Sequence, residues 1–121
     1  MKKFENFHSE LNEYVDYLKE LSLDIKDEGY ECNISYYPTS LNITLPINGF
    51  LNSDHTFISF IENSIKYMSK YKYKIVLQYE NGLITLDSKN TISFYEFTRL
   101  ISVDKYIGTI KLIFYYDKYK F

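Results

Sequence analysis

Alanine is absent from this 121-residue chain, and arginine occurs once, at Arg99, against 13 lysines. Both are residues with GC-rich codons, whereas the abundant lysine, isoleucine, asparagine and tyrosine are favoured by AT-rich genomes. The composition therefore predicts an origin in a low-GC bacterium, or in a phage or mobile element of one. Hydrophobic residues make up 45% and charged residues 25% of the chain, which is typical of a folded globular protein and excludes a disordered one.

Cysteine occurs once, at Cys32, so no internal disulfide can form, which favours a reducing compartment. No apolar signal segment follows the two N-terminal lysines, and no run approaches the roughly 20 apolar residues that cross a bilayer. We expect a cytoplasmic protein without a membrane partner.

Histidine and glycine are also scarce. His8 and His55 are the only histidines, and neither has metal-ligand spacing with Cys32 or a carboxylate. Four glycines form no phosphate-binding loop, and Cys32 reads as a small buried hydrophobe. We therefore expect no enzyme, with no catalytic, cofactor-binding or metal-binding residues.

Charge is sorted along the chain. Residues 1–64 carry four basic and eleven acidic side chains, a net −7, whereas residues 65–121 carry ten basic and five acidic ones, a net +5. Such a polarised molecule can present surfaces of opposite sign to different partners.

The first segment has helical periodicity ending near Gly29, with fraying from about Lys26. Its apolar residues are Phe4, Phe7, Leu11, Tyr14, Leu18, Leu21 and Ile25. The spacing also fits a coiled-coil seam, but Val15 and Tyr17 widen the stripe, which favours a helix facing a core.

The remaining pattern alternates strands and helices. Asn81-Gly82 predicts a two-residue hairpin turn with positive φ values. Ser53 predicts a helix N-cap, and Ser93 with Glu96 predicts a capping box. The expected elements are strands at 30–37 and 41–45, a helix from 53 to about 70, strands at 73–80 and 83–87, a helix from 93 to about 107 and a strand at 109–116.

These elements predict one α+β domain spanning residues 1–121, in the order αββαββαβ. Hairpin connections favour a mostly antiparallel sheet of about five strands, with three helices packed on one side.

An acidic helix face is the first candidate site. Glu13, Asp16, Glu20, Asp24 and Asp27 fall opposite the apolar stripe of the first helix, where like charges at this spacing do not stabilise it. We interpret them as a docking surface for a protein with a basic surface. The alternative is a helix face that is acidic only for solubility.

A basic and aromatic segment is the second candidate. It contains Lys66, Lys70, Tyr71, Lys72 and Lys74, and lysines with stacking tyrosines are typical of single-stranded nucleic-acid binding. The alternative is structural, because lysines suit a helix C-terminus and Lys66 follows Glu62 by four residues. A nucleic-acid partner is thus the less favoured prediction.

Tyr116 and Tyr119 in the C-terminal tail are candidate apolar anchors for a partner, unless codon bias alone explains them. The tail or a sheet edge could also form a homodimer.

We conclude that the sequence favours a small cytoplasmic protein-binding inhibitor, of the anti-defence type that includes anti-CRISPR proteins, encoded by a phage or mobile element. Its acidic helix would occupy a basic groove of the target. The alternatives are an immunity protein or antitoxin that masks a toxin, and a single-stranded nucleic-acid-binding module.

Overall fold

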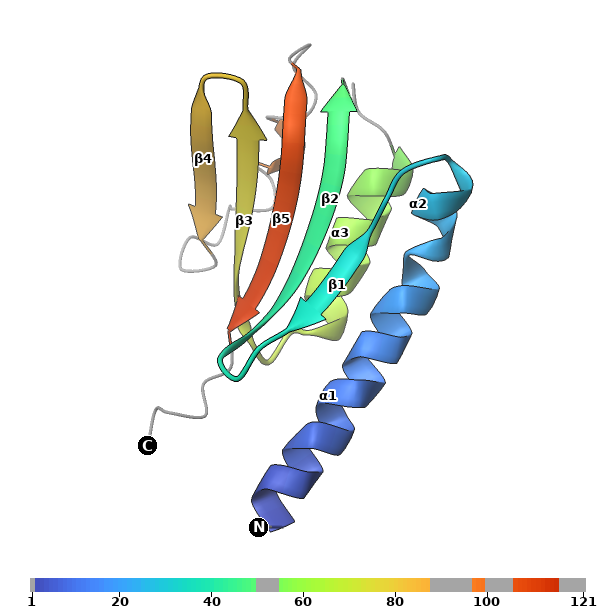
Figure 1. The fold of residues 1–121 in the computed structure, drawn as a ribbon, viewed down its shortest axis with the longest axis vertical. Helices are drawn as coiled ribbons and strands as arrows, with labels where there is room; N and C mark the ends of the chain where they lie inside the picture. The colour runs from blue at the N-terminus through green and yellow to red at the C-terminus, as the bar shows by residue number, and fades with distance from the viewer. Residues whose placement is uncertain (1, 50–54, 88–96, 100–105, 116–121) are drawn as a thin grey trace.

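A computed structural model describes residues 2–49, 55–87, 97–99 and 106–115, with the side chains of 12–49, 56–86, 97–99 and 106–115 (Figure 1). Residues 97–99 are helical, within the segment predicted for the last helix. The other elements are α1 (Lys2–Leu21), α2 (Leu23–Asp27), β1 (Asn33–Tyr36), β2 (Ser40–Gly49), α3 (His55–Tyr67), β3 (Lys72–Tyr79), β4 (Gly82–Asp87) and β5 (Ile107–Tyr115).

The five strands form one sheet in the order β1-β2-β5-β3-β4, and every neighbouring pair is antiparallel. The last strand in the chain is therefore the central one. Figure 1 shows the labelled helices on one side of this sheet, with its other face turned to the viewer. The predicted α+β fold and element order are confirmed.

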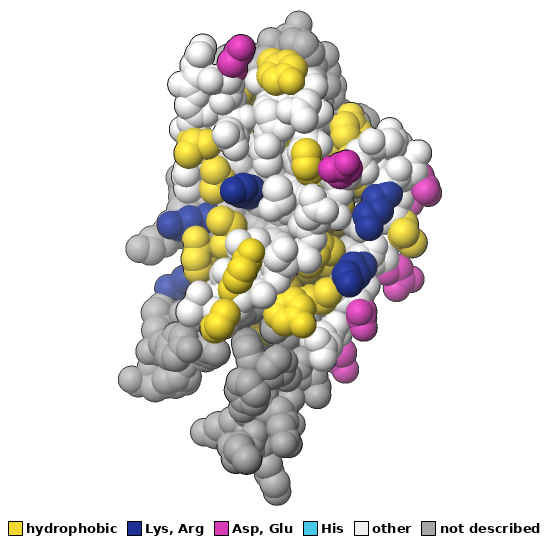
Figure 2. Space-filling model, viewed as in Figure 1, with side chains coloured by type: hydrophobic (Ala, Val, Ile, Leu, Met, Phe, Trp, Pro, Cys, Tyr) yellow, Lys and Arg dark blue, Asp and Glu magenta, His cyan; other side chains and the backbone are white. Residues whose placement is uncertain are grey.

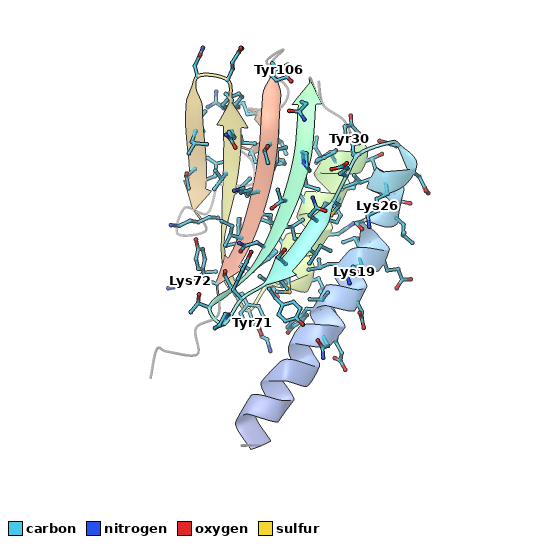
Figure 3. All side chains as sticks on the ribbon, in the orientation of Figure 1. Lys19, Lys26, Tyr30, Tyr71, Lys72 and Tyr106 are labelled. Carbon is cyan, nitrogen blue, oxygen red and sulfur yellow. The ribbon has the colours of Figure 1, made fainter. Side chains whose placement is uncertain are left out.

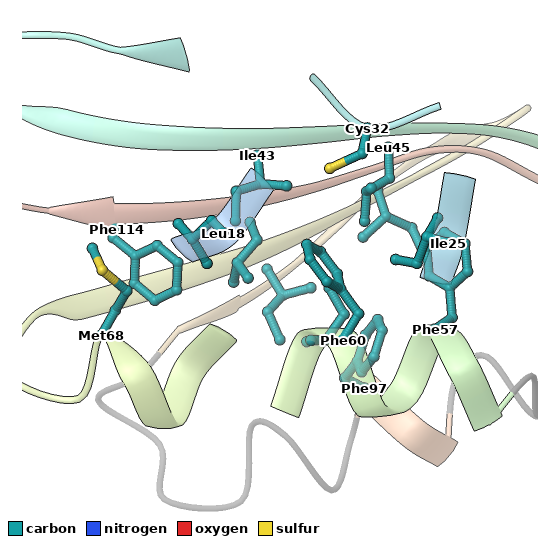
Figure 4. Packing of buried hydrophobic residues seen from close by; sticks show 14 of the residues in the cluster. Leu18, Ile25, Cys32, Ile43, Leu45, Phe57, Phe60, Met68, Phe97 and Phe114 are labelled. Carbon is teal, nitrogen blue, oxygen red and sulfur yellow. The ribbon is translucent and has the colours of Figure 1, made fainter. Parts of the chain in front are cut away.

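The core lies between the sheet and the helices. Leu41, Ile43 and Leu45 of β2 stand opposite Phe114, Leu112 and Ile110 of β5, and all six are fully buried. Opposed residues of an antiparallel pair share a face, so both strands turn these side chains to the helices. Phe57, Ile61 and Met68, from α3 and its C-terminal end, are fully buried in the same core, as their spacing predicts, and Figure 4 shows Phe57 and Met68 pointing from α3 toward the sheet.

The predicted first helix is interrupted at Ser22, which separates α1 from α2. The buried Ser22 hydroxyl donates a hydrogen bond to the Lys19 carbonyl at 2.7 Å, within its own helical turn. Backbone hydrogen bonds still run from Ser22 N–H to Leu18 and from Lys26 N–H to Ser22. The helical periodicity therefore continues from α1 into α2.

Gly29 ends this helical segment, as its sequence predicts. Its φ is +93°, a left-handed conformation that favours glycine. The Gly29 N–H donates to the Lys26 carbonyl at 2.9 Å, and the Tyr30 N–H to the Ile25 carbonyl at 3.2 Å. This pair of bonds is a Schellman motif, which satisfies carbonyls at the helix end.

For the second half of α1, the structure decides between the two predictions, a helix that faces the core and a coiled-coil helix. Val15 and Leu18 are buried against the sheet and α3, so the apolar side of residues 12–21 faces the core as predicted. The side chains of Phe4, Phe7 and Leu11 lie outside the described residues. Among the helices that the structure describes, none has the length and apolar character needed to cross a membrane.

Two local predictions about strands are wrong. The β3–β4 hairpin forms, but its turn is Glu80-Asn81, and of the predicted pair only Gly82 has a positive φ. β2 continues past Pro46 to Gly49, through an irregularity in its register with β5. Because β1 pairs with β2 only as far as Thr44, Pro46 lies where β2 is an edge strand and a proline is tolerated.

β1 is shorter than the predicted strand at 30–37. Cys32 is buried just before it, as expected, but Tyr36 is 47% exposed rather than part of an apolar face. β1 forms the edge of the sheet, where the helices only partly cover the side chains.

Candidate functional site

The acidic side chains of α1 and α2 form one outward surface. Glu13, Asp16 and Glu20 recur at intervals of three and four residues, and the continuous periodicity through Ser22 adds Asp24 and Asp27. All five are exposed, and Figure 2 shows acidic side chains along the outer edge of the helices. These five residues are called the acidic helical surface below.

No lysine or arginine of the described residues forms an ion pair with these five carboxylates. In contrast, Glu62 on α3 pairs with Lys66 at 3.2 Å. Lys19 and Lys26 are exposed on the flank of the helices seen in Figure 3, beside rather than within the acidic helical surface. Among the described side chains, the negative charge of this surface is therefore not neutralised by a direct ion pair.

A groove adjoins the C-terminal end of this surface, between α2 and α3. It has a volume of about 450 Å³ and is lined by Leu21, Asp24, Asp27, Glu28, Thr56, Ser59, Phe60 and Asn63. The Thr56 hydroxyl donates a 2.8 Å hydrogen bond to Glu28, which ties the end of α2 to the start of α3. A lining that combines three carboxylates with the apolar Leu21 and Phe60 suits the charged head and long stem of a lysine or arginine side chain.

Two exposed apolar side chains border the acidic helical surface. Tyr17 is 39% and Leu23 is 53% exposed. Tyr17 follows Glu13 by four residues, and Leu23 follows Asp16 by seven, so the two lie beside the carboxylates. Sequence reasoning placed Tyr17 in the apolar stripe and did not single out Leu23. The signal for Leu23 was available, since it breaks the otherwise polar outer face of the helix.

Tyrosines attach α1 to α3 below this surface. The ring of Tyr17 stacks on Tyr67, with centroids 3.8 Å apart, and Tyr14 meets the edges of Tyr67 and Tyr71 at 5.3 and 5.6 Å. Burial raises the pKa of Tyr14 well above its ordinary value, and the neighbouring Tyr71 raises it further. The Tyr14 hydroxyl therefore stays protonated at neutral pH and contributes no charge to the site.

The basic and aromatic segment is divided among several places. Lys66 lies on α3 in its ion pair with Glu62, and the Lys70 ammonium lies 5.7 Å from the ring centroid of Tyr14 and 5.4 Å from that of the half-buried Tyr71. Lys72 and Lys74 lie on β3. The five candidate nucleic-acid-binding residues thus do not form one continuous surface.

Other candidates stand as follows. Cys32 is buried, and this burial raises the pKa of its thiol, although a hydrogen bond from Ser22 and the charge of Lys26 oppose the shift. Tyr116 and Tyr119 lie outside the described residues, as do the side chains of His8 and His55. In the part of the chain that the structure describes, no group of three or more potential ligands could hold a metal ion.

Comparison of the chain with protein-family models, with curated proteins and with solved structures gives no significant match. The functional argument therefore rests on the geometry of the acidic helical surface and its groove.

Proposed function

We propose that the chain is a cytoplasmic protein-binding inhibitor that docks its acidic helical surface into a basic groove of a target protein. The observation that carries the proposal is the row of five exposed carboxylates, which form no ion pair with the side chains that the structure describes and continue into a groove lined by Asp24, Asp27 and Glu28. In keeping with the AT-rich coding signature, the target belongs to a defence system of a low-GC bacterium, and the gene to a phage or mobile element.

Rigidity of the helical segment supports the docking mode. Leu18 and Ile25 on its inner side are completely buried, and the Schellman motif at Gly29 fixes its end. Residues three and four apart on a helix are about 5–6 Å apart, so the carboxylates form a regular row of negative charge before the partner arrives. A preorganised row loses less conformational entropy on binding than flexible side chains on a loop.

Charge supplies attraction and orientation, while apolar contact supplies much of the affinity. Tyr17 and Leu23 occupy the borders of the acidic helical surface, where a bound protein would bury them. A groove that normally holds the phosphates of a nucleic acid would meet the same arrangement of negative charge, so the inhibitor competes with that ligand.

The experiment captures proteins from the native host with the purified wild type and with E13K/D16K/E20K. We expect a basic protein that the wild type retains at low salt and that the triple variant loses. Direct titration of that purified protein then measures affinity, and its activity is assayed with increasing inhibitor.

Two double variants distinguish the effect of the position of the carboxylates on binding from the effect of net charge. D16K/E20K and E31K/E80K change the net charge equally, but Glu31 and Glu80 are exposed outside the acidic helical surface. We expect D16K/E20K to weaken binding at least tenfold and E31K/E80K to weaken it less than threefold. Unchanged binding of E13K/D16K/E20K at low salt rules out the proposed docking mode.

A further inference from the structure

The face of the sheet that the helices leave open is basic along its central strands. In β3, Ile75 and Leu77 point into the core, so Lys72, Lys74 and Val76, which lie at the alternate positions of the strand, belong to the open face. In the register of β3 with β5, Lys72 stands opposite Tyr115, Lys74 opposite Ile113 and Val76 opposite Lys111. Two strands distant in sequence thus bring three lysines together.

These lysines form a short array. Alternate residues of a strand are about 6–7 Å apart, and diagonal neighbours on adjacent strands about 7–8 Å apart, which gives the Lys72–Lys74 and Lys74–Lys111 separations. The Lys74 ammonium lies 5.5 Å from the ring centroid of Tyr115, which places an aromatic surface within the array. Lys111, Lys72, Lys74 and Tyr115 are called the basic sheet face below.

Two further lysines lie on this side of the molecule, apart from the basic sheet face. Figure 2 shows lysine side chains on the open face of the sheet and on the neighbouring flank of the helices, where Figure 3 labels Lys19 and Lys26. The one carboxylate residue that the strand register places among these lysines is Asp87, opposite Lys74 at the end of β4. In the same view, acidic side chains line the outer edge of the helices, on the side of the molecule away from Lys72 (Figures 2 and 3).

We propose that the basic sheet face binds single-stranded nucleic acid. Lysines that follow an extended track suit a polyanion better than a compact ligand, and a tyrosine ring at the track can stack on a base. A single strand can follow the twist of a five-stranded sheet, whereas a straight acidic helix of a second copy would touch the twisted face over a shorter length. This surface is independent of the proposed inhibitor function, because none of its residues belongs to the acidic helical surface.

Fluorescence anisotropy with a labelled oligothymidine of about 16 nucleotides, at about 50 mM salt, tests this proposal. With three lysines on phosphates, the logarithm of the association constant should fall with the logarithm of the salt concentration with a slope of about −2. We expect K72E/K74E/K111E to weaken binding at least tenfold, with circular dichroism confirming that the variant is folded.

K111E and K66E form the matched pair, since each reverses one exposed lysine and Lys66 lies on α3, on the other side of the sheet. K111E should weaken binding and reduce the slope by about 0.7, whereas K66E should leave the slope unchanged. If the triple variant does not fold, K111Q against K66Q gives the same comparison.

Three results overturn the proposal: no binding by the wild type, equal binding by K111E and K66E, or salt-sensitive self-association that both K111E and D16K abolish. The last result would assign the face to a second copy of the chain. D16K/E20K should not weaken oligonucleotide binding. Failure of the nucleic-acid proposal and failure of the proposed inhibitor function can therefore be distinguished.

Discussion

Tyr17 on α1 stacks on Tyr67 at the end of α3, with ring centroids 3.8 Å apart and planes 16° apart. Tyr17 is also one border of the acidic helical surface. The same side chain therefore holds the helix to the body of the protein and offers exposed apolar area to a partner. This contact links the stability of the fold to the orientation of the five carboxylates.

A double-mutant cycle on these two tyrosines should detect their contact. We expect Y17A and Y67A together to destabilise the protein by less than the sum of the single changes, with a coupling of about 0.5–1.5 kcal/mol. Urea unfolding at neutral pH measures the four free energies. The Y17A and Y37A pair is the control, since Tyr37 is exposed at the β1–β2 turn, and a coupling as large there would contradict a specific contact.

Neutralising the acidic helical surface should stabilise the fold. In E13Q/D16N/E20Q, the like-charge pairs of residues 13 with 16, 16 with 20 and 20 with 24 disappear, each worth about 0.2–0.5 kcal/mol. The midpoint of urea unfolding should rise at low salt, and the gain should shrink at about 1 M salt because screening removes the repulsion. E80Q, in the β3–β4 turn, should change the midpoint little. A lower stability of the triple variant would show that these carboxylates serve the fold.

Gly29 should be sensitive to replacement because of its backbone alone. No atom lies within 4 Å of a Cβ placed there, so G29A adds no clash, but alanine must adopt a φ of +93°. We expect a loss of about 1–2 kcal/mol of unfolding free energy. G49A is the matched control, since its φ is not positive and its nearest atom lies at 3.8 Å. Equal losses in the two variants would contradict the left-handed helix end.

Alkaline pH should destabilise the protein through its tyrosines. Burial raises the pKa of Tyr14, Tyr67, Tyr71 and Tyr79 above the ordinary 10.0. Above this value the unfolded chain loses these protons while the folded chain keeps them, so the free energy of unfolding falls as the pH rises. The buried Cys32, with a pKa raised above 9.0, acts in the same direction from a lower pH.

Urea unfolding at several pH values between about 8 and 11 measures this effect, and Y14F should reduce the slope above pH 10 while keeping the ring contacts. Y106F, at a tyrosine that is 43% exposed, is the matched control for the loss of one hydroxyl. A free energy that is constant up to pH 11 would contradict the burial of these hydroxyls.

The periodicity of the sequence was sufficient to predict the fold. Alternation at Leu41, Ile43 and Leu45 and at Ile110, Leu112 and Phe114 defined the buried face of the sheet, and Gly29 marked the helix end. Departures occurred where long-range pairing decides the local structure. β2 passes through Pro46 because β5 continues beside it, and no local signal reports the length of a partner strand.

The candidate surfaces were predictable to different degrees. The acidic helical surface follows from helical spacing alone, so its residues could be named from the sequence. Lys111 could not be joined to Lys72 and Lys74, because only the pairing of β3 with β5 brings them together. The groove beside Glu28 likewise depends on the packing of α2 on α3.

The structure also separates acidic from basic side chains in space, but this separation does not coincide with the division between residues 1–64 and 65–121. Lys19 and Lys26 belong to the acidic half of the sequence and lie on the flank of the helices in the view that also shows the sheet lysines, whereas the acidic side chains follow the outer edge of the helices (Figures 2 and 3). The polarity of the molecule therefore comes from the orientation of the helix as well as from composition.

Affinity for the captured target protein tests the central claim most directly, compared between D16K/E20K and E31K/E80K at low salt. If the acidic helical surface occupies a basic groove, D16K/E20K should bind at least tenfold more weakly than the wild type, and E31K/E80K should bind nearly as tightly. Equal affinity of the two variants would contradict the claim, because only overall charge, and not the position of the carboxylates, would then matter.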